Sequence, residues 1–75
     1  MSMKQVEEKI VQLAHEFVKK YGEDALKIKQ DDRAKYIIPN LNRYEQEIFK
    51  HNQFKLLVLF HKTIVTDLRK SKKQL

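Results

Sequence analysis

Residues 54–68, FKLLVLFHKTIVTDL, decide the fold because they contain the longest uninterrupted apolar run of the chain, residues 56–60. A helix that is apolar on every side is normally surrounded by protein. At about 100° per residue, the stretch also forms one broad apolar stripe. This stripe contains Phe54, Leu57, Val58, His61, Ile64, Val65 and Leu68. We therefore expect a core helix at 53–72 whose first half is covered on several sides.

Three apolar residues of this helix, Leu56, Leu59 and Phe60, fall outside the stripe and exceed what one face can bury. We assign them to an interface, either with a second copy of the chain in a homodimer or with a larger protein. The alternative is that other helices of the same chain cover all sides of the 53–72 helix.

The positive charge is concentrated toward the end of the chain. Residues 1–47 contain nine Lys or Arg and nine Asp or Glu, whereas residues 48–75 contain seven Lys or Arg and one acidic residue, Asp67. The formal net charge of +6 therefore belongs entirely to the second segment. The predicted nucleic-acid-binding residues are cations of this segment that share or extend one helix edge: Lys55, Lys62, Arg69, Lys70, Lys72 and Lys73.

A basic edge of this kind indicates a polyanionic or acidic partner, either a nucleic acid backbone or an acidic protein surface. Cations in the last turn of a helix also complement its dipole, at roughly 0.3–1 kcal/mol each, and this structural role is the competing explanation. The sequence has few arginines and no helix-turn-helix signature with a glycine in the turn. Contacts with the phosphate backbone are therefore expected, rather than sequence-specific readout of bases.

The first helix is predicted over residues 2–21. Ser2 and Gln5 have the spacing of a capping box. Apolar residues then recur every three or four positions up to Tyr21. Gly22, the only glycine, stands where a residue in the left-handed conformation commonly ends a helix.

The middle of the chain has two interpretations. Acidic pairs at residues 23–24 and 31–32 predict the first turns of short helices near 24–30 and 32–37, because negative charge is favoured there. The alternative is a β-hairpin at 26–38, since apolar and polar residues alternate on both sides of residues 31–32. An Asp-Asp pair forms a poor hairpin turn, so helices are favoured.

The next helix is predicted over 43–51, because Asn42 and Glu45 repeat the capping-box spacing. Tyr44 and Ile48 are expected to supply its buried face, with Phe49 as a further candidate. The apolar pattern then shifts to another side of the helix, which favours a second helix after this one. The alternative is one bent helix from about 43 to 72.

Asn52 stands at this shift and is expected to cap the helix at 53–72. The fold class is therefore all-α, a small bundle of four to five helices in a single domain over residues 1–75. The basic tail at 69–75 is expected to fray.

The chain offers few groups for catalysis. It contains no Cys, its serines lie near the two ends, and its single glycine cannot form a phosphate-binding loop. The histidines, His15, His51 and His61, do not have the spacing of a zinc site. We therefore expect no enzymatic activity, no metal and no cofactor.

Two of the histidines differ in their predicted surroundings. His15 falls on the polar face of the first helix, where a solvated ring is expected. His61 falls in the apolar stripe and is expected to be packed and hydrogen-bonded to a neighbouring helix. The alternative for His61 is a pH-sensitive contact at an interface.

No secretory signal is expected, since residues 1–20 are interspersed with charges. The apolar runs are too short for a membrane span, and the absence of cysteine is compatible with a cytoplasmic location. The predicted function is that of a small basic helical regulatory protein that associates with nucleic acid through its C-terminal helix. The alternative is an interaction factor, such as an inhibitor, antirepressor or immunity-type regulator, that docks on a larger protein.

Overall fold

The computed structural model describes residues 2–73, with side chains through Ser71. In this part of the chain there are four α-helices, Met3–Tyr21 (α1), Gln30–Ile37 (α2), Arg43–His51 (α3) and Gln53–Lys73 (α4). Two 3₁₀ helices, Gly22–Lys27 (η1) and Ile38–Asn40 (η2), lie between them. The predicted all-α bundle is confirmed. The alternative with a hairpin at 26–38 is wrong, because α2 occupies most of that segment.

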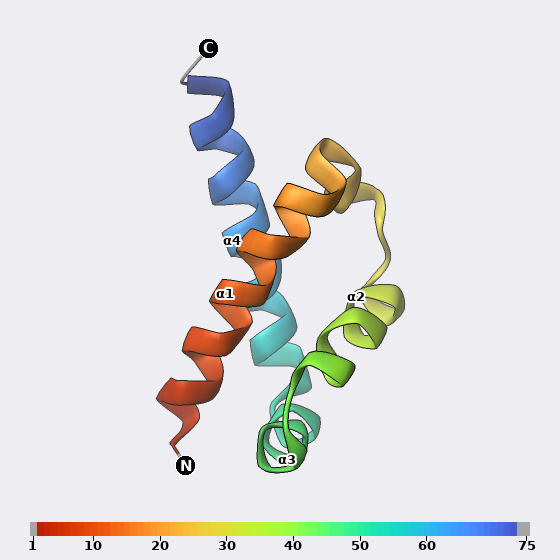
Figure 1. The fold of residues 1–75 in the computed structure, drawn as a ribbon, viewed down its shortest axis with the longest axis vertical. Coiled ribbons are helices and arrows are strands. Elements are labelled where there is room, and N and C mark those ends of the chain that lie inside the picture. Colours follow the sequence, from red (N-terminus) through yellow and green to blue (C-terminus); the bar gives the residue numbers. More distant parts are fainter. Residues whose placement is uncertain (1, 74–75) are drawn as a thin grey trace.

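The central pair of the bundle consists of α1 and α4. These two helices pack side by side, cross at an angle and run in the same direction (Figure 1). The chain between them returns through η1, α2, η2 and α3. In Figure 1, α2 lies beside the pair, and α3 lies at the end of the bundle where α4 begins.

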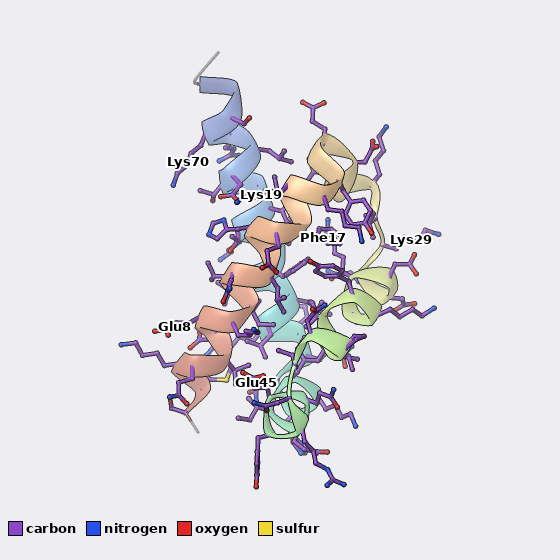
Figure 2. The ribbon with its side chains drawn as sticks, viewed as in Figure 1. Glu8, Phe17, Lys19, Lys29, Glu45 and Lys70 are labelled. Atoms are coloured by element: carbon purple, nitrogen blue, oxygen red, sulfur yellow. The ribbon has the colours of Figure 1, made fainter. Side chains whose placement is uncertain are left out.

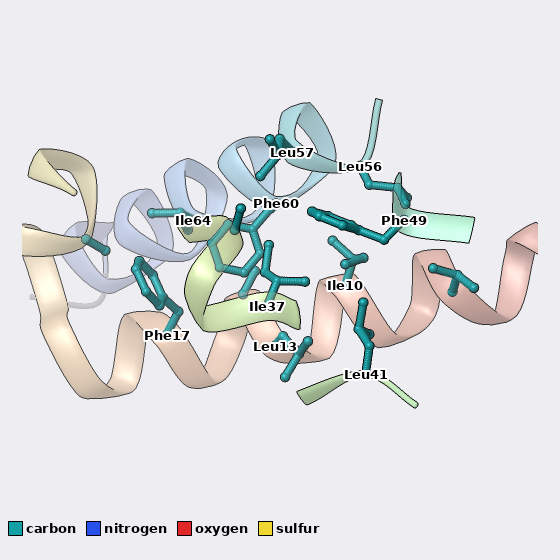
Figure 3. Close-up of a cluster of buried hydrophobic side chains, with 14 residues drawn as sticks. Ile10, Leu13, Phe17, Ile37, Leu41, Phe49, Leu56, Leu57, Phe60 and Ile64 are labelled. Atoms are coloured by element: carbon teal, nitrogen blue, oxygen red, sulfur yellow. The ribbon is translucent and has the colours of Figure 1, made fainter. Parts of the chain in front are cut away.

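The core is one apolar cluster that receives side chains from all four helices (Figure 3). Four aromatic rings form a group that extends from the core to the surface: the ring of Phe17 lies 5.1 Å from that of Phe60, 4.9 Å from that of Tyr36 and 4.8 Å from that of Tyr21. Aromatic pairs of this kind contribute about 0.5–1.5 kcal/mol beyond the area that they bury. The ring cluster therefore joins α1, α2 and α4.

The buried face of α4 differs from the predicted stripe. Its buried residues are Leu56, Leu57, Phe60 and Ile64. Phe54, which the stripe placed in the core, is 83% exposed, and His61 is also exposed. The phase of α4, meaning its rotation about its own axis, decides which side faces the core. Because the run at 56–60 is apolar on all sides, it is compatible with the predicted phase and with the observed one. Packing against α1 selects the phase that buries Leu56 and Phe60.

Both predicted capping boxes are present. The hydroxyl of Ser2 accepts from the backbone N–H of Gln5 at 3.4 Å, and the Gln5 side chain accepts from the Ser2 N–H at 3.3 Å. Asn42 and Glu45 form the same reciprocal pair at 2.9 and 2.7 Å. Gly22 follows α1 with φ +56° and ψ −136°, so its φ is positive, as predicted, while its ψ differs from that of a left-handed helix. Such a backbone is accessible mainly to glycine.

Three local predictions are corrected. The helix expected near 24–30 is instead the 3₁₀ helix η1. Tyr44 is 73% exposed, because α3 turns Phe49, at 1% exposure, toward the core. The Asn52 side chain does not cap α4: it donates back to the carbonyl of Ile48 at 2.9 Å and so closes α3.

The helix predicted over 53–72 is confirmed, since α4 runs from Gln53 to Lys73. Residues 74–75 of the basic tail lie outside the described part of the chain. Among the helices within residues 2–73, none combines the length and the apolar character needed to cross a membrane.

Candidate nucleic-acid interface

Three basic residues on α4, Lys55, Lys62 and Arg69, form what we call the cation row. They are seven residues apart, so each lies about 10.5 Å from the next along the helix axis. At about 100° per residue, all three fall within about 40° of one another. All three residues are exposed. Phe60 lies two residues from Lys62, about 200° around the helix, so the row faces away from the core.

The other predicted binding cations lie near the end of α4. Lys70 is exposed, and Figure 2 shows its side chain pointing away from the bundle. Lys72 and Lys73 belong to α4, but their side chains lie beyond those that the structure describes. The structure therefore places four of the six predicted residues on the solvent-exposed surface of one helix.

The cation row lacks the acidic partners that three other lysines of the protein have. Elsewhere, weak surface ion pairs join Lys27 to Asp24 at 3.7 Å, Lys35 to Asp32 at 4.0 Å and Lys50 to Glu47 at 4.0 Å. Among the described side chains, no carboxylate lies within ion-pair distance of the cation row or of Lys70. The outward face of α4 therefore carries positive charge that the protein itself does not neutralise.

The acidic residue of α4, Asp67, faces the neighbouring helix. Its Oδ2 lies 2.5 Å from Nδ1 of His15 in α1. Because an ionised carboxylate only accepts hydrogen bonds, His15 donates from Nδ1. The predicted exposure of His15 is confirmed, since its side chain is 49% exposed; its contact with α4 was not predicted.

Arg33 of α2 is buried, at 3% exposure. Its Nη2 donates to the carbonyl of Ala25 at 2.9 Å, and its Nη1 lies 3.0 Å from Nδ1 of His61. Arginine has no acceptor atoms, so His61 accepts this hydrogen bond. Burial lowers the pKa of Arg33 below its usual value. The predicted hydrogen bond of His61 to a neighbouring helix is thus present, although His61 itself is exposed.

The predicted interface residues separate into two groups. Leu56 and Phe60 have no exposed surface, so their assignment to an interface is wrong: α1 and the helices beside it cover them. Leu59 is partly buried and packs at the edge of the core. It lines a groove of about 370 Å³, together with four residues of α1: Lys4, Glu7, Glu8 and Val11.

A second, smaller hollow lies between η1 and α4. It measures about 260 Å³ and is lined by Glu23, Leu26, Lys27 and Leu68. Throughout the residues that the structure describes, His, Asp and Glu side chains do not gather in groups of three that could hold a metal ion.

Comparisons of this chain with protein-family models, curated proteins and solved structures found no match. Its function is therefore argued from the geometry and charge of its own residues. One exposed residue near the cation row, Phe54, was missed as a site residue because the sequence pattern placed it in the core. Its exposure depends on the phase of α4, which the tertiary packing sets.

Proposed function

We propose that this chain is a non-enzymatic binding protein that associates with the phosphate backbone of nucleic acid through the outward face of α4. The observation that carries the proposal is the cation row, whose members are exposed, aligned on one helix face and without ion pairs among the described side chains. Cations that neutralise phosphates release counterions from the nucleic acid, and this provides affinity without recognition of a sequence.

The helix dipole does not account for this arrangement. A dipole favours cations in the last turn of a helix and disfavours them in the first. Lys55 lies in the first turn of α4, which begins at Gln53, and Lys62 lies near its middle. A role in complementing the helix dipole therefore explains the basic residues from Arg69 onward, but it does not explain Lys55 and Lys62.

The direct test measures binding to a fluorescent oligonucleotide at several salt concentrations. Replacing Lys55, Lys62 or Arg69 singly with Gln should weaken binding to different sequences about equally, and should lower the slope of log affinity against log salt by roughly one. Truncation after Leu68 should remove most of the affinity, since it deletes four basic residues. Absence of binding at about 50 mM salt and micromolar protein would reject the proposal, because electrostatic binding is strongest at low salt.

Docking on a larger protein or on a second copy of the chain is the other candidate function. The groove between α1 and α4 favours it, since its lining combines the partly buried apolar residues Val11 and Leu59 with charged residues of α1. Under this alternative, wild-type protein at micromolar concentration forms a homodimer and Leu59→Lys gives a folded monomer. Light scattering distinguishes the two masses, and a wild-type mass of one chain would count against self-association.

A further inference from the structure

Phe54 is the most exposed of the large hydrophobic residues in the described chain, at 83%. It lies in the first turn of α4, directly before Lys55. The aromatic contacts within residues 2–73 all involve other rings. Burying a Phe side chain removes apolar area from water and is favourable, so the free protein leaves this stabilisation unused at Phe54.

The position of Phe54 relates it to the cation row. Phe54, Val58 and Lys62 follow one another at intervals of four residues, so they lie on adjacent parts of the same side of α4. Val58 is partly buried, whereas Phe54 and Lys62 are exposed. A linear ligand that follows the cation row toward the beginning of α4 therefore reaches the Phe54 ring beside Lys55.

We infer that the preferred ligand of this surface is single-stranded nucleic acid, with a base stacked on Phe54 and the phosphates beside the cation row. This inference rests on the proposed function. In a duplex the bases are stacked on one another and present only their edges in the grooves. In a single strand the faces of the bases are free, and each base that stacks on an aromatic side chain contributes about 1–3 kcal/mol.

The surroundings of Phe54 favour a nucleic acid over an apolar protein surface. The other exposed large hydrophobic residues, Tyr21, Leu26 and Tyr44, belong to α1, η1 and α3. On α4 itself, the exposed neighbours of Phe54 are the polar Gln53 and the cationic Lys55. An isolated ring at the end of a row of cations matches a ligand that alternates flat bases with anionic phosphates.

The test compares an oligothymidylate with a duplex of similar length, both fluorescently labelled, at one low salt concentration. Phe54→Ala should weaken binding to the single strand by roughly 5- to 150-fold, the equivalent of about 1–3 kcal/mol, and should leave duplex affinity within about twofold. Phe54→Tyr should restore most single-strand affinity because it keeps the ring. Tyr44→Ala is the matched control, since it removes an exposed ring from α3 and should change neither affinity.

The outcomes separate this inference from the proposed function. If wild-type protein binds both probes and Phe54→Ala weakens neither, or weakens both equally, stacking on Phe54 is rejected while backbone binding by α4 stands. If wild-type protein binds neither probe, both proposals fail. If light scattering shows a wild-type dimer that Phe54→Ala converts to a monomer, Phe54 belongs to a contact between copies and the inference is overturned.

Discussion

His15 of α1 and Asp67 of α4, 52 residues apart in sequence, are joined by a contact of 2.5 Å between Nδ1 and Oδ2. The contact joins the two parallel helices in addition to the packing of the aromatic rings. On the helix, Asp67 also lies away from the cation row, since Asp67 and Arg69 are about 200° apart around its axis. The outward face of α4 is therefore cationic although α4 contains an aspartate.

Replacing Asp67 with Asn should affect stability more than binding. The contact with His15 is partly exposed, and exposed side-chain pairs contribute about 0.2–1 kcal/mol. We expect a decrease of that size in the free energy of unfolding, measured with urea, and a salt slope of nucleic-acid binding that stays the same. His15→Gln and the double variant complete a thermodynamic cycle. If the double variant loses the sum of the free energies of unfolding lost by the two single variants, the two side chains do not interact in solution.

Replacement by alanine should destabilise the protein much more at one phenylalanine of α4 than at the other. Phe60 has no exposed surface and contacts the Phe17 ring, so Phe60→Ala should lower the free energy of unfolding by about 3–5 kcal/mol. Phe54→Ala should lower it by less than about 0.5 kcal/mol, because the ring is exposed. Urea denaturation followed by circular dichroism measures both. Equal costs would contradict the phase of α4 described above.

Arg33 should be replaceable by a side chain of similar length without charge. Its burial leaves Nε without a hydrogen-bond partner, and burying a charge is costly. Arg33→Met should therefore destabilise the protein less than Arg33→Ala, which also leaves a space. For Arg33→Ala we expect a loss of about 1–3 kcal/mol, because the carbonyl of Ala25 loses its donor. Comparable losses in both variants would show that the hydrogen bonds outweigh the cost of the buried charge.

Stability should decline at alkaline pH through Tyr36. Burial, followed by the charges of Glu16 and Tyr21, raises the pKa of Tyr36 above its ordinary value. The unfolded chain therefore loses this proton at lower pH than the folded protein does. The stabilisation is fully present below about pH 10, and it is lost as the pH rises through the raised pKa.

The measurement is the melting temperature of the wild type and two variants between pH 8 and about pH 11. Tyr36→Phe should reduce the alkaline decline, whereas Tyr44→Phe, at an exposed position, should retain it. An unchanged decline in Tyr36→Phe would assign the effect to other groups.

Local signals in the sequence were sufficient to place several helix ends. The side-chain to backbone pairs at Ser2 and Asn42 span three residues, so their spacing alone predicted the starts of α1 and α3. The acidic residues in the first turn of α2 likewise indicated a helix where a hairpin was the alternative. Signals within one turn of the chain need no knowledge of the tertiary fold.

The predictions that were wrong, and the contacts that were not predicted, concern features that depend on residues distant in sequence. The run at 56–60 is apolar on all sides, so only the position of α1 decides that Leu56 faces inward while Phe54 faces solvent. Arg33 and His61, which are in contact, are 28 residues apart in the sequence, and no pattern in the sequence near either residue predicts this pair. The cationic edge of α4 was visible in the sequence, because its members repeat every seven residues. The contact of Asp67 with His15 was not.

The central claim is tested most directly by comparing two triple variants of equal charge for binding to a single-stranded oligonucleotide. One carries Lys55→Gln, Lys62→Gln and Arg69→Gln; the control carries Lys27→Gln, Lys35→Gln and Lys50→Gln, at lysines that already have acidic partners. Each lowers the formal net charge from +6 to +3. We predict that the cation-row variant loses most affinity and about three units of salt slope, while the control stays close to the wild type. Equal losses in the two variants would mean that net charge alone drives binding and would contradict a binding face on α4.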